Sequence, residues 1–138
     1  MAGTAVIPHL NVEDASEAIA FYATALGATE LARVPADDGK RLLHAALTIN
    51  GSTVFLHDDF PEHVFPGANF GPPPRVGGVS VTMHLVVDDC DAWYDRAMKA
   101  GATTVIAPHD AFWGDRYAQI VDPFGHSWSF ACALPAKA

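Results

Sequence analysis

Two histidines, His9 and His84, begin matching stretches of the chain and are the first candidates for chemistry. The stretches read HLNVED over 9–14 and HLVVDD over 84–89, and they lie 75 positions apart. An imidazole can ligate a divalent metal or hydrogen-bond a substrate. A catalytic zinc site generally uses three protein ligands, so two histidines do not define one. The repeat itself predicts two equivalent units with a shared groove.

The elements that must position these histidines also occur twice. Each stretch precedes an amphipathic run that ends at a glycine, Gly27 in the first half and Gly101 in the second. Apolar periodicity predicts two β-α-β-β-β modules in an α+β fold. The expected elements are strands at 5–12, 29–34, 42–49 and 52–57 around a helix at 15–26, then strands at 79–87, 103–106, 116–121 and 127–132 around a helix from 89 to about 100, with a loop at 108–112.

A proline-rich segment separates the two halves. It runs from Asp58 to Gly78 and includes the triplet Pro72-Pro73-Pro74, which excludes a regular helix or a central strand there. We therefore expect one domain over 1–138, with module one at about 4–58, a connector at about 59–78 and module two at about 79–134.

The amino-acid composition limits the classes of partner that the protein is expected to bind. The net charge of −8 argues against nucleic acid and anionic membranes, which require clustered Lys and Arg. No signal peptide and no bilayer-spanning run is visible, so a cytoplasmic protein is expected. The two cysteines, Cys90 and Cys132, form no C-x-x-C motif and are interpreted as buried, inert thiols.

The sequence stretches at 112–117 (FWGDRY) and 122–129 (DPFGHSWS), in a chain predicted to contain two copies of one module, resemble the vicinal-oxygen-chelate superfamily. This superfamily includes glyoxalase I, extradiol dioxygenases, fosfomycin-resistance enzymes and bleomycin-resistance proteins, and the two stretches together are similar to its PhnB-like branch. The resemblance implies a cupped eight-stranded mixed sheet with helices on its outer face. It also implies a metal held by the first and last strands of each module, which would act as a Lewis acid.

The metal ligands of the family do not carry over to this chain. The matching positions are Ile7 on the first strand, Thr82 on the fifth, Ser129 on the last, and Val54 or Phe55 in the first module. We therefore expect the family's own metal site to be lost and no cofactor to be required. A relocated zinc, nickel or manganese site around His9 and His84, with His57 or His44 as a third ligand, stays open because strand alternation turns both histidines the same way as the lost ligands.

The resemblance also marks other groove positions. Residues that face the ligand in fosfomycin-type relatives correspond to Tyr117 and Gln119, and a phenol and a carboxamide suit the orientation of a small polar molecule. Phe112 and Trp113 could form a lid, but packing under the loop is the favoured interpretation. For Arg116 we favour a salt bridge to Asp115 or another carboxylate over anion binding. The expected pocket consists of His9, His84, Trp113, Tyr117, Gln119 and Ser129.

Three functions remain open on the sequence. The first is a metal-free protein that binds a small organic molecule between the modules, as bleomycin-resistance proteins do. The second is a metal-dependent lyase, isomerase or transferase with relocated ligands around His9 and His84. The third is a domain whose groove is filled by its own side chains. Homodimerisation is an expectation from the family.

Overall fold

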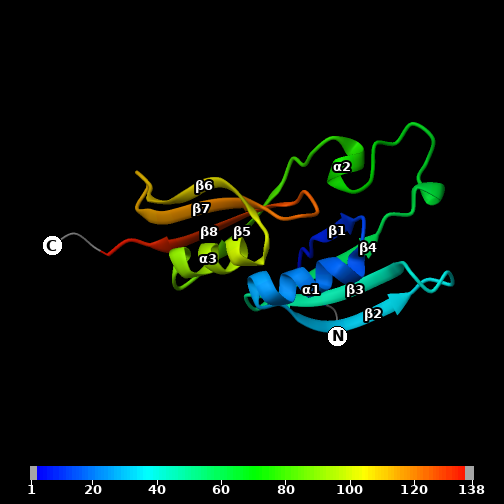
Figure 1. The fold of residues 1–138 in the computed structure, drawn as a ribbon, viewed down its shortest axis with the longest axis horizontal. Helices are drawn as coiled ribbons and strands as arrows, with labels where there is room; N and C mark the ends of the chain where they lie inside the picture. Colours follow the sequence, from blue (N-terminus) through cyan, green and yellow to red (C-terminus); the bar gives the residue numbers. More distant parts are fainter. Residues whose placement is uncertain (1–2, 136–138) are drawn as a thin grey trace.

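Eight strands and three helices, arranged as two similar modules, make up the computed structural model, which describes residues 3–135 (Figure 1). The first module contains β1 (His9–Val12), α1 (Ala15–Leu26), β2 (Thr29–Pro35), β3 (Leu42–Ile49) and β4 (Ser52–Asp58). The second contains β5 (Thr82–Val86), α3 (Cys90–Ala100), β6 (Thr103–Asp110), β7 (Asp115–Val121) and β8 (Ser127–Ala133). Each module forms a four-stranded mixed sheet, ordered β1-β4-β3-β2 and β5-β8-β7-β6. The predicted α+β fold of two β-α-β-β-β modules is confirmed.

The helices begin and end at residues that the sequence repeats. Asp14 and Asp89 are the N-caps of α1 and α3, and each carboxylate accepts the backbone N–H three residues later at 3.1 Å. Gly27 and Gly101 end the two helices with positive φ angles of 65° and 119°, a conformation that glycine adopts without strain. The same two local signals, an aspartate N-cap and a glycine at the end, therefore set the helix boundaries in both modules.

Strand ends differ from the prediction by more than one residue in three places. β1 begins at His9 rather than Ala5, and β5 begins at Thr82 rather than Val79. The predicted loop at 108–112 is wrong for its first part, because β6 continues to Asp110. Pro108 is tolerated there because β6 is an edge strand, and its pairing with β7 shifts register between Ile106 and His109.

The two modules share one hydrophobic core. In Figure 1 the sheets lie side by side, and α1 and α3 meet near the centre of the molecule. Tyr22 of α1 reaches into the second module, where its hydroxyl donates to Asp122 in the turn between β7 and β8. Trp128 of β8 donates to the same carboxylate at 2.8 Å and is 1% exposed. Apolar burial around this contact joins the modules without a hydrogen-bonded strand pair between the sheets.

The connector carries two short helical segments, the 3-10 helix η1 (Pro61–His63) and α2 (Pro73–Val76). Pro73 and Pro74 occupy the first turn of α2. Backbone N–H groups in the first turn have no partner within a helix, so the missing N–H of proline costs no hydrogen bond there. Within residues 3–135, no helix combines the length and apolar character needed to cross a membrane.

Candidate functional site

Each sheet has one face covered by α1 or α3, and the opposite face, called the helix-free face, carries neither of these two helices. On β5, β7 and β8 the side chains of Leu85, Ala118 and Phe130 are buried toward α3. Strand alternation places their neighbours on the opposite, helix-free face. The residues on that face include His84, Tyr117, Gln119 and Ser129, which the register keeps on adjacent strands. Four of the six predicted pocket residues therefore lie on one face of the second module.

Hydrogen bonds order the polar part of this face. The Nδ1 of His84 and the Oγ of Ser129 share a hydrogen bond of 2.7 Å. Gln119 donates through Nε2 to the Oγ of Ser127 at 2.9 Å, and that hydroxyl also bonds the Thr82 hydroxyl at 2.9 Å. Ser127 and Ser129 are only 6% and 2% exposed, so they serve to hold the more accessible His84, Gln119 and Thr82 side chains in place.

Aromatic rings surround Tyr117 on the same face. His84 stacks on it with ring centroids 6.2 Å apart and planes 21° apart. Trp113 approaches its edge at 5.5 Å, and the indole N–H is held by Asp115 at 3.0 Å. Trp113 is half exposed and therefore adds the fifth predicted pocket residue to this surface.

The packing interpretation is wrong for Phe112. Its side chain is 98% exposed and contacts only the edge of the Trp113 ring among the aromatic residues described. Gly114 follows this pair with a positive φ of 97°, a conformation that glycine adopts without strain. The sequence does not indicate that Phe112 is exposed, because two adjacent aromatic residues can either be buried under a loop or point into solvent.

The sixth predicted residue, His9, lies on the helix-free face of the first module. Its ring centroid is 4.6 Å from that of His57 and 5.7 Å from those of His44 and Phe55. Partial burial, and then the neighbouring His57 and His44, lower the pKa of His9. This cluster of three imidazoles thus favours a neutral ring at its centre.

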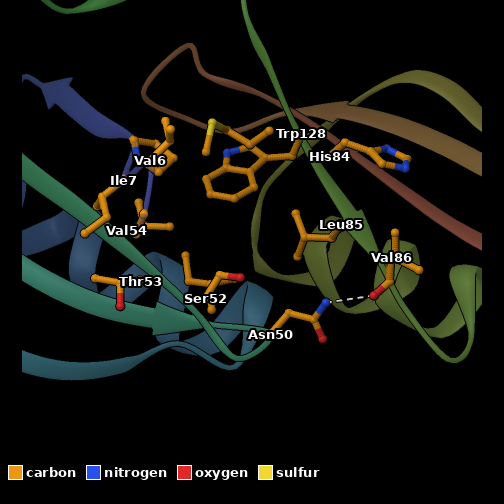
Figure 2. Close-up of a pocket in the computed structure, with 14 residues that line it drawn as sticks. Val6, Ile7, Asn50, Ser52, Thr53, Val54, His84, Leu85, Val86 and Trp128 are labelled. Atoms are coloured by element: carbon orange, nitrogen blue, oxygen red, sulfur yellow. Dashed lines mark hydrogen bonds between the residues drawn. The ribbon is translucent and has the colours of Figure 1, made fainter. Parts of the chain in front are cut away.

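Between the modules lies a cleft of about 610 Å³ that is lined by His84 but not by His9 (Figure 2). Figure 2 shows Trp128 and Leu85 on one side and Ile7 and Val54 on the other, with Asn50 donating to the carbonyl of Val86 at 2.8 Å. The two histidines thus belong to separate faces within one chain.

The residues at the family's metal positions do not fit a divalent cation. The uncertain position in the first module offers no ligand in either register: Val54 lines the cleft beside Ile7, and the Phe55 ring lies against His9 and His44 on the helix-free face. An isoleucine, a valine or phenylalanine, a threonine and a serine offer no anionic or imidazole ligand. Among residues 3–135, no three His, Cys, Asp or Glu side chains are grouped so as to hold a metal ion.

Two other predicted roles can be placed. Arg116 pairs with Asp91 at 3.0 Å and with Asp110 at 3.0 Å, so the salt bridge is confirmed, with partners other than Asp115. Cys90 is buried, and desolvation raises the pKa of its thiol to about 11, as expected for an inert cysteine. Cys132 is only partly buried, so the expectation of full burial is wrong for it.

The sequence analysis missed Asp122 as a structural centre. Its carboxylate accepts from Tyr22, from Trp128 and from the backbone N–H groups of Phe124 and His126. Burial, and then this carboxylate, raise the pKa of Tyr22 well above its ordinary value. A DPxG turn signals a turn but not the tyrosine that reaches it from the other module.

With this geometry established, comparison with known proteins identifies the family. The Glyoxalase/Bleomycin resistance protein/Dioxygenase superfamily model matches residues 4–130, and the chain belongs to this superfamily. An uncharacterised protein of Mycobacterium tuberculosis (strain H37Rv) is 54% identical over 125 residues, which cover 91% of this chain and 72% of the relative.

Two solved structures extend the comparison. TioX from Micromonospora sp. ML1 is 27% identical, with a TM-score of 0.73 over 96% of this chain and 100% of TioX. A PhnB protein from Bacillus cereus has a TM-score of 0.70 over 94% of this chain and 100% of its own. At 16% identity this second likeness concerns the fold alone.

Proposed function

We propose that this protein binds a small, planar organic molecule on the helix-free faces of its sheets, without a metal at the family's position. The observation that carries the proposal is the surface around Tyr117. There, aromatic rings of His84 and Trp113 adjoin a hydrogen-bonded row that includes Ser129 and Gln119. Stacking on the rings would hold the body of the ligand, and the polar row would orient its substituents.

The chemistry of the residues supports binding without a metal. Ile7, Thr82, Ser129 and either Val54 or Phe55 correspond to the ligand positions of metal-binding relatives, and Ser129 is already bonded to His84. A surface of this kind recognises shape and hydrogen bonds rather than vicinal oxygens chelated to a cation. We further propose that the protein belongs to the PhnB-like branch, because its sequence at 112–117 and 122–129 resembles that branch. We also propose a cytoplasmic location, which cell fractionation would test.

The proposed assembly is a homodimer in which a second copy covers the helix-free faces. Apolar side chains on these faces are exposed in the single chain: Val86 next to His84 on β5, Val34 opposite His44, and Ile106 opposite Gln119. Exposed apolar surface beside a polar pocket is typical of an interface. Light scattering should give twice the mass of the chain, and a monomer at the concentrations used for calorimetry would refute the dimer.

Calorimetry on protein dialysed against EDTA tests the binding proposal, with naphthalene-2-carboxamide as a planar probe. The probe should bind in the absence of metal, and chloride salts of zinc, nickel and manganese should show no tight, stoichiometric binding. A probe that binds only after one equivalent of metal has been added would overturn the proposal, and so would a probe that does not bind at all.

A further inference from the structure

A second pocket lies between the first module and the connector. Its volume is about 430 Å³, within the range of small-molecule sites. Its lining is mainly apolar and includes Phe60, Val64, Phe65 and Phe70 from the connector. Its polar members include Asn11 of β1 and His57 of β4. None of these residues contributes to the surface around Tyr117.

Asn11 contributes to this pocket a side-chain acceptor that has no hydrogen-bond partner among the described residues. On β1 the side chains of Leu10 and Val12 are buried in the core under α1, so alternation turns Asn11 to the helix-free face. Asn11 is only 6% exposed, and its Oδ1 has no hydrogen-bond partner among the described residues. A buried acceptor without a partner is costly, and its presence in a native fold calls for an explanation.

His57 offers a second acceptor beside it. The register pairs Asn11 with His57 across the parallel strands β1 and β4. The Nδ1 of His57 lies 2.7 Å from the carbonyl oxygen of Asp58, and a carbonyl only accepts, so this nitrogen donates. In the neutral ring Nε2 is therefore an acceptor. The ring also stacks on Phe70, with centroids 6.3 Å apart and planes 22° apart.

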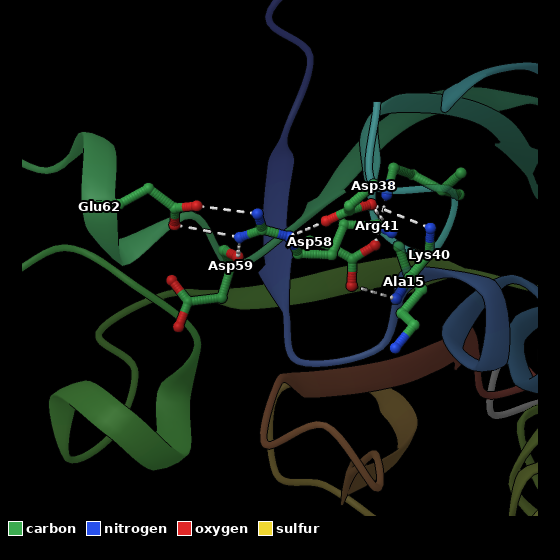
Figure 3. Close-up of polar contacts among 8 residues, drawn as sticks. Ala15, Asp38, Lys40, Arg41, Asp58, Asp59 and Glu62 are labelled. Carbon is green, nitrogen blue, oxygen red and sulfur yellow. Dashed lines mark hydrogen bonds and ion pairs between the residues drawn. The ribbon is translucent and has the colours of Figure 1, made fainter. Parts of the chain in front are cut away.

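Ion pairs hold the connector over this pocket. Arg41 binds Glu62 of η1 through two contacts of 2.8 and 3.0 Å, and it binds Asp38 at 2.7 Å (Figure 3). The Arg41 guanidinium also lies 4.2 Å from the centre of the Phe60 ring. Hydrogen bonding to Arg41 lowers the pKa of Glu62 to about 2, so this clamp persists in mildly acidic solution. The connector segment 59–75 covers the pocket and is called its roof. At the other end of this roof, Arg75 of α2 binds Asp59 at 2.7 Å.

We propose that this pocket binds a small aromatic hydrogen-bond donor, of which phenols are the simplest class. The phenyl rings of the connector would enclose the aromatic body, and the hydroxyl would donate to Oδ1 of Asn11 or Nε2 of His57. Two acceptors that share an apolar enclosure select a donor over a molecule of the same shape without one. This site is independent of the ligand surface proposed above.

Fluorine NMR titration of the full chain tests this proposal with two probes that differ in one group. 4-Fluorophenol carries the donor, whereas in 4-fluoroanisole a methyl group replaces its proton. The wild-type protein should bind 4-fluorophenol about fivefold more tightly, the factor expected for one hydrogen bond. Asn11→Leu should bring the two affinities together, whereas Trp113→Ala, on the other module, should leave both unchanged. Arg75→Met should weaken both probes by a similar factor because it loosens the roof.

Three results would overturn the proposal. They are failure of 4-fluorophenol to bind, a preference that survives in Asn11→Leu, and a preference that is lost in Trp113→Ala. If Asn11→Leu does not fold, His57→Phe keeps the ring and removes the second acceptor, and it should reduce the preference. Nuclear Overhauser contacts from 4-fluorophenol to the Phe60 or Phe70 rings are then required, and their absence would also overturn the proposal. Loss of naphthalene-2-carboxamide binding alone would affect only the first proposal.

Discussion

The two modules share their backbone signals and differ on the faces that those signals create. Both have an aspartate N-cap, a glycine helix end and a histidine on an edge strand paired with the last strand. Yet His9 meets two other histidines and a phenylalanine, whereas His84 meets a serine and a tyrosine. The residues that build the module are repeated, and, apart from the two histidines, the residues on the helix-free faces are not.

The turns before the last strands differ in the same way. In the first module the turn is Asn50-Gly51, and the Asn50 side chain donates an exposed hydrogen bond to the carbonyl of Val86. In the second module the equivalent turn starts with buried Asp122, which binds Tyr22 of the first module. The second turn therefore links the two modules through a buried carboxylate, whereas the first turn does so through an exposed amide.

The largest effect should come from Asp122. Asp122→Ala removes the acceptor of two buried side chains, and we expect the free energy of unfolding to fall by about 3 kcal/mol or more. Glycine readily adopts the positive φ of 50° found at Asn50 in the matching turn. Asn50→Gly should therefore lower the free energy of unfolding by less than about 1 kcal/mol. Urea denaturation measures both, and equal losses would contradict the difference between the turns.

Removal of Trp113 should weaken ligand binding without unfolding the protein. Trp113→Ala should reduce the affinity for naphthalene-2-carboxamide about five- to tenfold, because one aromatic contact with Tyr117 and the ligand is lost. Phe112→Ala is the matched control: its ring is next in sequence and almost fully exposed, so affinity should not change. Calorimetry decides, and an effect of Phe112→Ala equal to that of Trp113→Ala would exclude the proposed surface.

The helix caps should show the equivalence of the modules. Asp14→Ala and Asp89→Ala each remove one N-cap hydrogen bond of 3.1 Å. Each should lower the free energy of unfolding by about 1 kcal/mol. Thermal denaturation followed by circular dichroism compares the two variants, and losses that differ by more than twofold would argue against equivalent caps.

The smallest effect concerns pH. The pKa of His9 is lowered in the folded protein, so the unfolded chain binds the proton more readily. The contribution of His9 to stability is therefore complete above the ordinary value of 6.5 and is lost as pH falls below it. His9→Asn should reduce the drop in melting temperature between about pH 7.5 and pH 5.5. An unchanged drop would show that His9 does not contribute.

Most of the fold could be predicted because its signals are local. Glycine ends, aspartate caps and the Asn50-Gly51 hairpin act within a few residues and mark each element directly. The errors occurred where tertiary context overrides such signals. Pro108 reads as a break, but an edge strand with an irregular register accommodates it.

The candidate site was less predictable. Alternation identified which residues share a face, and it grouped His84, Tyr117, Gln119 and Ser129 correctly on adjacent strands. It could not relate faces of different modules, since that depends on how α1 and α3 pack. The unpartnered amide of Asn11 was equally invisible, because an orphaned acceptor is defined by what its neighbours in space fail to offer.

The most direct test of metal-free binding is a proton–nitrogen NMR titration of EDTA-treated protein with naphthalene-2-carboxamide. We expect the backbone signals of His84, Tyr117 and Ser129 to shift in a saturable manner, and zinc, nickel or manganese added beforehand should not strengthen binding. Shifts confined to other parts of the chain, or shifts that arise only after a metal is added, would contradict the account.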